Sequence, residues 1–231
     1  MKHTVVIPLY NKEAFIFDTI SSLAFQEKKP SQIIIVDDCS TDESLFHLKE
    51  ALSFFAPQFL LTDVQIIELK ENKGSGNARN IGIELANGDL ISFLDADDYY
   101  TYYCLAEVSA VMQRKNIVVL ILGILLVPSE NYLPNIKSFE AELDFVSNSL
   151  FLIPNALHTI FLADFIIGSN VVIRRKHLKK IRFETNNSFC EEIDFWLRVL
   201  ENLSKNNRIA LLNKACIEIR EVKRNDSFNS F

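Results

Sequence analysis

Residues 89–100 read DLISFLDADDYY and join a short apolar run to a cluster of carboxylates. The run Leu90–Leu94 is short and apolar enough to be a buried strand. It ends in Asp95, Asp97 and Asp98, and burying like charges together is costly unless a cation compensates them. Carboxylate oxygens are hard ligands, so the cluster predicts a site for Mn²⁺ or Mg²⁺. An acidic turn that merely closes the strand is the alternative.

Three further strand patterns, separated by helix patterns, precede this stretch. The expected strands cover residues 4–9, 32–36 and 64–69. The expected helices run from Asn11 to about Gln26, from the capping box at residues 40–43, and from the loop 71–76 to about Ala86. This alternation is typical of βαβ units with parallel strands. We therefore expect an α/β fold with a Rossmann-like, mostly parallel central sheet flanked by helices.

Polar residues follow each of these predicted strands. In a parallel sheet the carboxyl ends of the strands share one edge, and ligands bind at that edge. The residues in question are Pro8, Tyr10, Asn11, Asp37, Asp38, Asn72, Asp95, Ala96, Asp97 and Asp98. Four loops that converge on one crevice favour a nucleotide-type ligand held beside a metal.

Several side chains suit the parts of such a ligand. Asp37 or Asp38 can accept a hydrogen bond from a base N–H, as in a uracil imide, and Tyr10 offers a ring for stacking. Arg79, early in the third helix, suits phosphate. The structural alternatives are an Asx turn at Asp37 and Asp38, a core position for Tyr10 and a surface ion pair for Arg79. The loop NKGSGNARN lacks GxGxxG and GxxxxGK[ST], which disfavours a dinucleotide dehydrogenase and a P-loop phosphotransferase.

A second informative stretch, SFCEEIDFWLRVLENL at residues 188–203, predicts a helix that opens with a capping box at Ser188 and Glu191. The helical wheel assigns Ile193, Trp196, Leu200 and Leu203 to the buried face, and Glu191, Asp194 and Arg198 to the solvent face. Glu192 falls within the apolar stripe. A carboxylate facing a cleft is partly desolvated, which raises its pKa and suits a general base. Interaction with the helix N-terminus alone is the alternative.

Composition excludes several classes of protein. The chain has 231 residues, 48% hydrophobic residues, 18 Phe and a net charge of −6, which indicates a globular protein without a basic footprint for nucleic acid. Cys39, Cys104, Cys190 and Cys216 show neither zinc-site nor disulfide spacing, which favours a reducing compartment. The longest apolar run, Ile117–Val127, is too short to span a membrane and reads as a core strand, with a kink at Gly123. Val171–Arg174 is a further strand. We expect a cytoplasmic protein without a transmembrane segment. Short basic clusters, Arg174-Arg175-Lys176 and Lys179-Lys180, are usually solvated surface, and contact with an anionic membrane face is the alternative.

Together these stretches resemble the family 2 glycosyltransferases, which have the GT-A fold. The matching segments are VVIPLYNKEAFIFDTISSL, IIIVDDCSTDES, NKGSGNARNIGIELANGDLISFLDADD and CEEIDFWLR. The resemblance implies a single GT-A domain over residues 1–231, with a nucleotide-sugar half (1–98) and an acceptor half (99–231). It implies inverting transfer from a nucleotide-sugar, with a UDP-sugar favoured, to a hydroxyl of a glycan or lipid-linked glycan in surface polysaccharide synthesis.

The resemblance also implies roles for individual residues. Pro8, Tyr10, Asp37 and Asp38 would surround the base, while Asp95, Ala96 and Asp97 form the DxD motif, with Asp95 nearer the ribose and Asp97 on the metal. Glu192 would be the base, at a position where the family usually has Asp, with Glu191 and Asp194 as further candidates. Arg220 or Lys223 would lie near the diphosphate. The rival interpretations are a sugar-nucleotide nucleotidyltransferase, which the loop PLYNKEA disfavours, and a degenerate transferase domain that binds without turnover.

Overall fold

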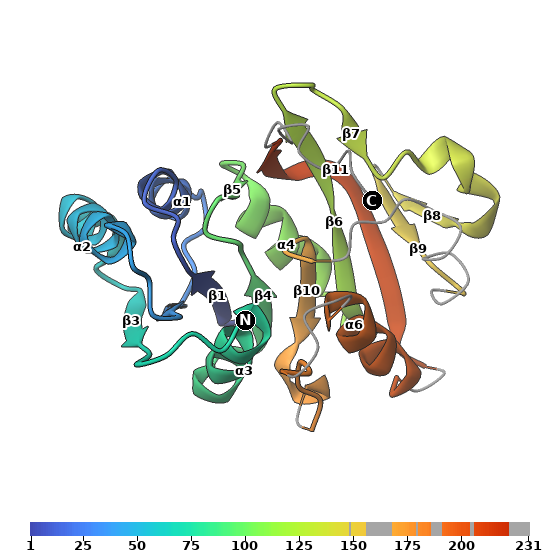
Figure 1. Ribbon diagram of the computed structural model, residues 1–231. Helices are drawn as coiled ribbons and strands as arrows, with labels where there is room; N and C mark the ends of the chain where they lie inside the picture. Colours follow the sequence, from blue (N-terminus) through green and yellow to red (C-terminus); the bar gives the residue numbers. More distant parts are fainter. Residues whose placement is uncertain (148, 156–167, 179, 186–190, 204–205, 222–231) are drawn as a thin grey trace, which may run out of the picture.

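An eleven-stranded mixed sheet forms the centre of the computed structural model, which describes residues 1–147, 149–155, 168–178, 180–185, 191–203 and 206–221 (Figure 1). Along its main path the strand order is β3-β2-β1-β4-β10-β6-β11-β9-β8. The short strands β5 (Tyr99–Tyr100) and β7 (Tyr132–Leu133) pair with β11 and β6. The predicted α/β fold with a mostly parallel core is confirmed.

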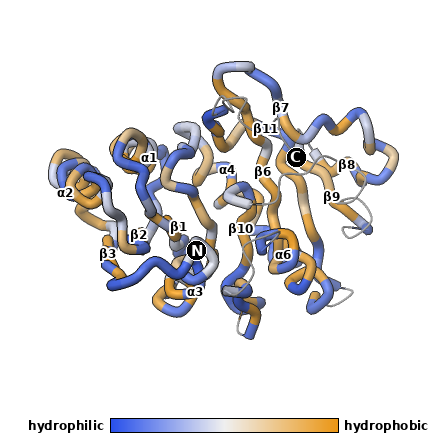
Figure 2. The backbone as a smooth tube through the Cα atoms, in the orientation of Figure 1, coloured by the Kyte–Doolittle hydropathy of each residue, from blue (hydrophilic) through white to orange (hydrophobic). Residues whose placement is uncertain are grey.

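The first half of the sheet is parallel. It contains β1 (His3–Leu9), β2 (Gln32–Asp37), β3 (Asp63–Glu68) and β4 (Leu90–Phe93), with Val5 opposite Ile33 and Ile33 opposite Val64. Alternate residues of β1 and β2 point to opposite faces, as the two-residue period of a strand requires. One face packs against α1 (Ile16–Ala24), α2 (Ser44–Phe54) and α4 (Cys104–Met112), and the other against α3 (Ser75–Leu85) and α6 (Glu191–Glu201). The apolar residues are concentrated on these buried strands and inner helix faces (Figure 2).

The second half of the sheet is mixed. Strand β10 (Val171–Arg174) lies antiparallel between β4 and β6 (Ile117–Val127), and β11 (Arg208–Arg220) runs parallel to β6. Strands β9 (Leu150–Leu152) and β8 (Asp144–Ser147) complete the sheet. The remaining short elements within the described segments are the 3₁₀ turns η1 (Ala56–Phe59), η2 (Ile136–Ser138), η3 (Glu140–Glu142) and η4 (Arg175–His177).

Gly123 marks an irregularity of strand pairing rather than an end of β6. The strand continues through it, and the register with β11 shifts where Leu212 and Ala215 face Leu122 and Gly123. A Cβ atom at this position would lie 2.6 Å from the backbone oxygen of Lys214. The irregularity predicted at Gly123 is therefore present, but it takes the form of a bulge in the partner strand.

Two predicted helix starts were wrong. Asn11 does not cap α1, which begins at Ile16; it has a φ of +50°, and its side chain hydrogen bonds with Thr41. The predicted capping box at residues 40–43 does not form either, because Thr41 is engaged by Asn11 and α2 begins at Ser44 without a capping-box contact. Asp42 instead accepts hydrogen bonds from the backbone N–H of Ser44 and of Glu13. These contacts join the loops that follow β1 and β2.

Helix α6 is rotated from the predicted wheel. Its buried residues are Phe195, Trp196 and Val199, while Ile193 is 46% exposed. Phe195 stacks on Phe183 with ring centroids 3.7 Å apart, which fixes this face against α3 and β4. The rotation also brings Glu191, predicted to face solvent, into contact with α3. Ser188 and Cys190 lie outside the described residues, so the predicted capping box there is not tested.

No helix among residues 1–147 and the later described segments has the length and apolar character needed to cross a bilayer.

Candidate active site

A cleft of about 580 Å³ opens at the carboxyl edge of the parallel strands. It is lined by residues from the ends of β1, β2 and β4, by Asn72 in the loop after β3, and by the start of α3, as βαβ topology requires. Seven of the predicted donor-site and metal residues line it: Pro8, Tyr10, Asp38, Arg79, Asp95, Ala96 and Asp97. The four loops expected to converge on one crevice therefore do so.

The two aspartates after β2 play different structural parts. Asp38 is buried, and its carboxylate accepts hydrogen bonds from the backbone N–H groups of Lys73 and Gly74, at 2.8 and 2.6 Å. It therefore pins the loop before α3 to the cleft. Asp37 accepts a longer contact from the N–H of Ser40 at 3.3 Å, which is the Asx-type alternative, and it does not line the cleft. Tyr10 is 42% exposed beside the cleft, so its ring is not a core residue.

Arg79 connects α3 to the acidic groups of two other elements. It is 4% exposed, and its Nη2 atom lies 2.7 Å from Oδ1 of Asp95 and 2.7 Å from Oε1 of Glu192. The two carboxylate oxygens are thus no more than twice that distance apart. Burial opposes the charge of Arg79, but Asp95 and Glu192 outweigh it and raise the pKa of Arg79. One guanidinium therefore holds the end of β4 and the start of α6 together.

The other terminal nitrogen of Arg79 is unsatisfied. Nη1 is buried and has no hydrogen-bond partner in the part of the chain that the structure describes; the nearest carboxylate oxygen, Oε1 of Glu191, is 3.7 Å away. A buried donor without an acceptor is costly, and in a native protein it commonly awaits a water or ligand. Nη1 is therefore an unsatisfied buried donor on a residue that also lines the cleft.

Glycines allow the acidic pair of α6 to approach the cleft. A Cβ atom on Gly168 would lie 2.6 Å from Oε2 of Glu192, and one on Gly76 would lie 2.9 Å from Oε2 of Glu191. The hydroxyl of Ser75 donates to Oε1 of Glu191 at 2.5 Å. Burial raises the pKa of Glu192, and the opposing effect of Arg79 does not cancel it. Glu192 is therefore a carboxylate of increased basicity that is joined to the cleft through Arg79 but is not among the residues that line it, whereas Glu191 is held against α3.

The three aspartates after β4 lie in different surroundings. Asp95 meets Arg79, and Asp97 meets Nζ of Lys12 at 2.5 Å. Asp98 is buried and accepts a hydrogen bond from the hydroxyl of Ser169 at 3.0 Å. Burial, together with the charges of Asp95 and Asp97, raises the pKa of Asp98 to about 8. Asp98 therefore belongs to the support of the site, and Asp95 and Asp97 are the carboxylates that line the cleft.

These carboxylates fit a cation that is shared with a bound ligand. Among the described residues no group of three or more His, Cys, Asp and Glu side chains could hold a metal by itself. Mg²⁺ and similar ions are commonly bound by one or two carboxylates together with substrate phosphates and waters. Asp95 and Asp97 supply hard oxygen ligands of that kind, and Lys12 supplies the positive charge beside Asp97.

Sequence reasoning missed Lys12 and Ser75. Lys12 lies four residues after Pro8 in the loop PLYNK, so its position beside the cleft could have been predicted from the sequence. Its ion pair with Asp97 could not have been predicted in the same way. Arg220 lies outside the cleft lining: it forms an ion pair with Asp18 at 2.6 Å and covers the rings of Phe15 and Tyr99. Lys223 lies outside the described residues.

Comparison with known proteins agrees with this geometry. TarS of Staphylococcus aureus, a poly(ribitol-phosphate) β-N-acetylglucosaminyltransferase, is 30% identical over 125 residues, covering 53% of this chain and 21% of TarS. WfaP of Escherichia coli, a UDP-Glc:α-D-GlcNAc-diphosphoundecaprenol β-1,3-glucosyltransferase, is 27% identical over 201 residues, covering 85% of this chain and 69% of WfaP. The matched region thus spans about a fifth of the length of TarS.

Solved structures extend the likeness to nearly the whole fold. A crystal structure of S. aureus TarS in complex with UDP superposes with a TM-score of 0.76 at 25% identity, covering 96% of this chain and 61% of that chain. The complex of TarS with UDP-GlcNAc gives a TM-score of 0.77 at 24% identity, with 100% and 62% covered. The fold is therefore of the GT-A type. Residues 4–182 match the family described as Glycosyl transferase family 2, and the chain belongs to that family.

Proposed function

We propose that the protein is an inverting glycosyltransferase that moves a hexosyl or N-acetylhexosaminyl group from a UDP-sugar to a hydroxyl of a surface glycan or lipid-linked glycan precursor. The observation that carries the proposal is the joint pairing of Asp95 and Glu192 with Arg79 at the rim of the cleft. It brings the DxD carboxylate and the proposed base within reach of one ligand. TarS and WfaP, which act with N-acetylglucosamine and glucose, support the two sugar classes.

The cleft offers a place for each part of the donor. The ring of Tyr10 would stack on the base, with Asp38 beside it as an acceptor for an imide N–H. The diphosphate would lie toward the side chains of Lys12 and Arg79, which line the cleft. Asp97, with Asp95, would hold Mn²⁺ or Mg²⁺ on the diphosphate, and that ion would neutralise charge on the leaving group.

Glu192 would take the proton of the acceptor hydroxyl. As the acceptor oxygen forms its bond to the anomeric carbon, the bond from that carbon to the diphosphate oxygen breaks and the nucleoside diphosphate departs. A single displacement from the opposite face inverts the centre. The raised pKa of Glu192 suits this role, because a stronger base accepts the proton more readily near neutral pH. Residues 99–231 would form the acceptor side of the domain.

The test is turnover by the full chain with UDP-GlcNAc and UDP-glucose, measured as UDP release with polyol-phosphate and GlcNAc-diphosphate-lipid acceptors. Glu192→Gln keeps the size of the side chain and should lower kcat by about 10²- to 10⁴-fold with unchanged UDP binding. Glu201→Gln, exposed at the end of the same helix, is the matched control and should leave kcat unchanged.

Two results would contradict the proposal. UDP-sugar binding without transfer to any of these acceptors would favour the degenerate-domain alternative. Full activity in Glu192→Gln would show that Glu192 is not the base and would leave Glu191 or Asp194 as the candidates.

A further inference from the structure

The edge of the sheet opposite the cleft combines exposed apolar side chains with positive charge. Parallel strands place all their starts on this edge, so the segments that precede β1, β2, β3, β4 and β6 meet there, as does the end of the antiparallel strand β10. The strand register shows that the starts of β1 and β4 and the end of β10 lie side by side, since His3 and Arg174 both pair with Leu90. We call this surface, from β3 to β6, the amino edge.

Four large apolar residues are exposed on one side of the amino edge. Leu60 and Leu61, just before β3, are 82% and 96% exposed, and Phe54 and Phe25, at the ends of α2 and α1, are 70% and 55% exposed. The rings of Phe25 and Phe54 both contact Phe55, so these two phenylalanines lie together rather than at scattered positions. The hydroxyl of Thr62 donates to the carbonyl of Pro30, which places the leucine pair beside the segment before β2.

Basic side chains occupy the rest of this edge. They are Lys2, Lys28, Lys29, Arg114, Lys115, Arg174, Arg175 and Lys176, in a chain whose net charge is −6. None of them forms a salt bridge with another described residue, whereas Lys12, Lys49, Arg79, Arg198 and Lys214 elsewhere are each paired with a carboxylate. The exposed carboxylates on the same edge are Glu27, Asp63, Glu84 and Asp89, of which Glu84 pairs with Arg182, so positive charge prevails.

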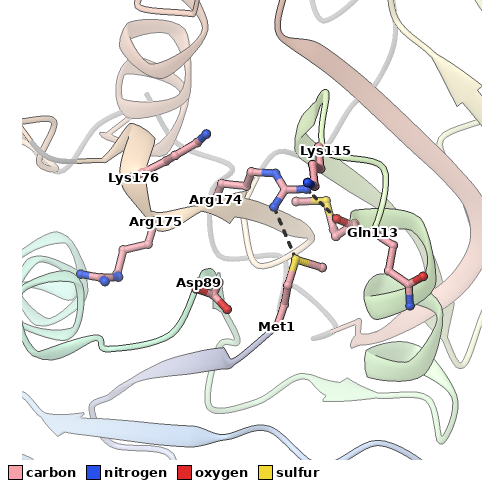
Figure 3. Close-up of a pocket in the computed structure, with 8 residues that line it drawn as sticks. Met1, Asp89, Gln113, Lys115, Arg174, Arg175 and Lys176 are labelled. Atoms are coloured by element: carbon pink, nitrogen blue, oxygen red, sulfur yellow. Dashed lines mark hydrogen bonds between the residues drawn. The ribbon is translucent and has the colours of Figure 1, made fainter.

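A pocket of about 780 Å³ lies among these cations. Figure 3 shows Lys115, Arg174, Arg175 and Lys176 around it, with Met1 and Asp89 below them in this view. Arg174 and Arg175 are held in place by backbone carbonyls, of Ile117 and Met112 for Arg174 and of Gly88 for Arg175. Bonds to carbonyls orient these guanidinium groups without neutralising them, so the pocket suits an anionic group.

We propose that the amino edge docks the protein on a bilayer that contains anionic phospholipid. Apolar side chains enter the headgroup region, neighbouring cations meet lipid phosphates, and the two contributions add. The leucine and phenylalanine patch beside the unpaired cations has this composition. Because β1 has seven residues, the cleft at its far end would lie about 20 Å above the lipid surface. If the proposed function holds, an acceptor carried on the same membrane has to extend by about that length.

Co-sedimentation with vesicles tests the proposal without reference to activity. The full chain should bind phosphatidylcholine vesicles that contain about one third phosphatidylglycerol, bind pure phosphatidylcholine weakly, and be released by high salt. Lys115→Glu with Lys176→Glu, and separately Leu60→Ser with Leu61→Ser, should each weaken binding at least about tenfold. All four side chains are exposed, and an unchanged melting temperature verifies the fold.

Lys137→Glu and Phe145→Ser are the matched controls, since both residues are exposed on the distant η2–β8 part of the chain. Absence of binding to the anionic vesicles overturns the proposal, and so does equal loss in the controls. If Leu60→Ser with Leu61→Ser instead converts a dimer to a monomer, measured by sedimentation velocity, while vesicles are not bound, the amino edge is an interface between two copies and the proposal is wrong.

Discussion

Replacement of Arg79 by Met should lower the stability of the fold, and should lower it more at neutral pH than in acid. Arg79 is buried, and two carboxylates accept charge-assisted contacts from it at 2.7 Å. Such contacts are worth about 1.5–3 kcal/mol each, but Asp95 and Glu192 remain about one-third exposed and regain some hydration. We therefore expect a loss of about 3 kcal/mol near pH 7.5, since removing one partner of a buried ion pair leaves uncompensated charge. At about 2–4 °C per kcal/mol for a chain of this size, the melting temperature falls by roughly 6–12 °C.

The pH dependence of the stability lost in Arg79→Met shows whether uncompensated carboxylate charge causes the loss. Without Arg79, burial and repulsion by the charges of Asp95 and Glu191 raise the folded-state pKa of Glu192 further above its unfolded value. The unfolded chain then ionises first as pH rises, so the variant loses stability above about pH 4 and differs least from the wild type in acid. Thermal unfolding at pH 5 and pH 7.5 measures this. Arg182→Met, whose contact with Glu84 is 3.7 Å and partly exposed, should cost less than about 1 kcal/mol at both values. A loss in Arg79→Met as small as in Arg182→Met, or one that does not grow with pH, would refute the reasoning.

Three further substitutions probe close contacts and a buried base. Gly168→Ala places a Cβ 2.6 Å from Oε2 of Glu192, so turnover should fall at least about tenfold while UDP binding, measured by calorimetry, stays within twofold. Gly82→Ala drives a Cβ to 2.2 Å from Cγ1 of Val6 and should destabilise the fold by about 1–3 kcal/mol in urea unfolding, as overpacking does. Burial lowers the pKa of His3 to about 3, so the unfolded state alone binds a proton below pH 6.5 and the wild type loses about 1.4 kcal/mol per pH unit there. His3→Gln should lack this pH-dependent loss of stability. If the unfolding free energies of the two proteins change in parallel between pH 7 and pH 5, burial of neutral His3 is not the cause.

The sequence predicted the parallel half of the sheet well because its strands are short, apolar runs between clear helix patterns. The bounds of β6 and β10 were also correct, since both are buried apolar runs. The place of β10 between β4 and β6 was not predictable, because strand order depends on packing between segments far apart in the chain. The predicted starts of the first two helices were wrong for a similar reason, because Asn11 and Thr41 hydrogen bond with each other across two loops instead of capping their own helices.

The site was predictable as a set of residues but not as a network. The carboxyl ends of parallel strands meet at one edge of a sheet, so the sequence alone predicts that Pro8, Asp38 and Asp95 lie close together. The ion pair from Arg79 to Glu192 depends on how α6 rotates against α3, and that rotation follows from the stacking of Phe195 on Phe183. A helical wheel drawn from the sequence does not include contacts with other segments, and for that reason it placed Glu191 on the wrong face.

The most direct measurement of the central claim is isothermal titration of UDP into the full chain, with and without Mn²⁺, for the wild type and Asp97→Asn. If the cleft is a nucleotide-sugar site, UDP binds the wild type, Mn²⁺ strengthens the binding, and Asp97→Asn removes most of that gain while the melting temperature stays within a few degrees. UDP that fails to bind with either Mn²⁺ or Mg²⁺ present, or that binds Asp97→Asn with the same gain from Mn²⁺, would contradict the account.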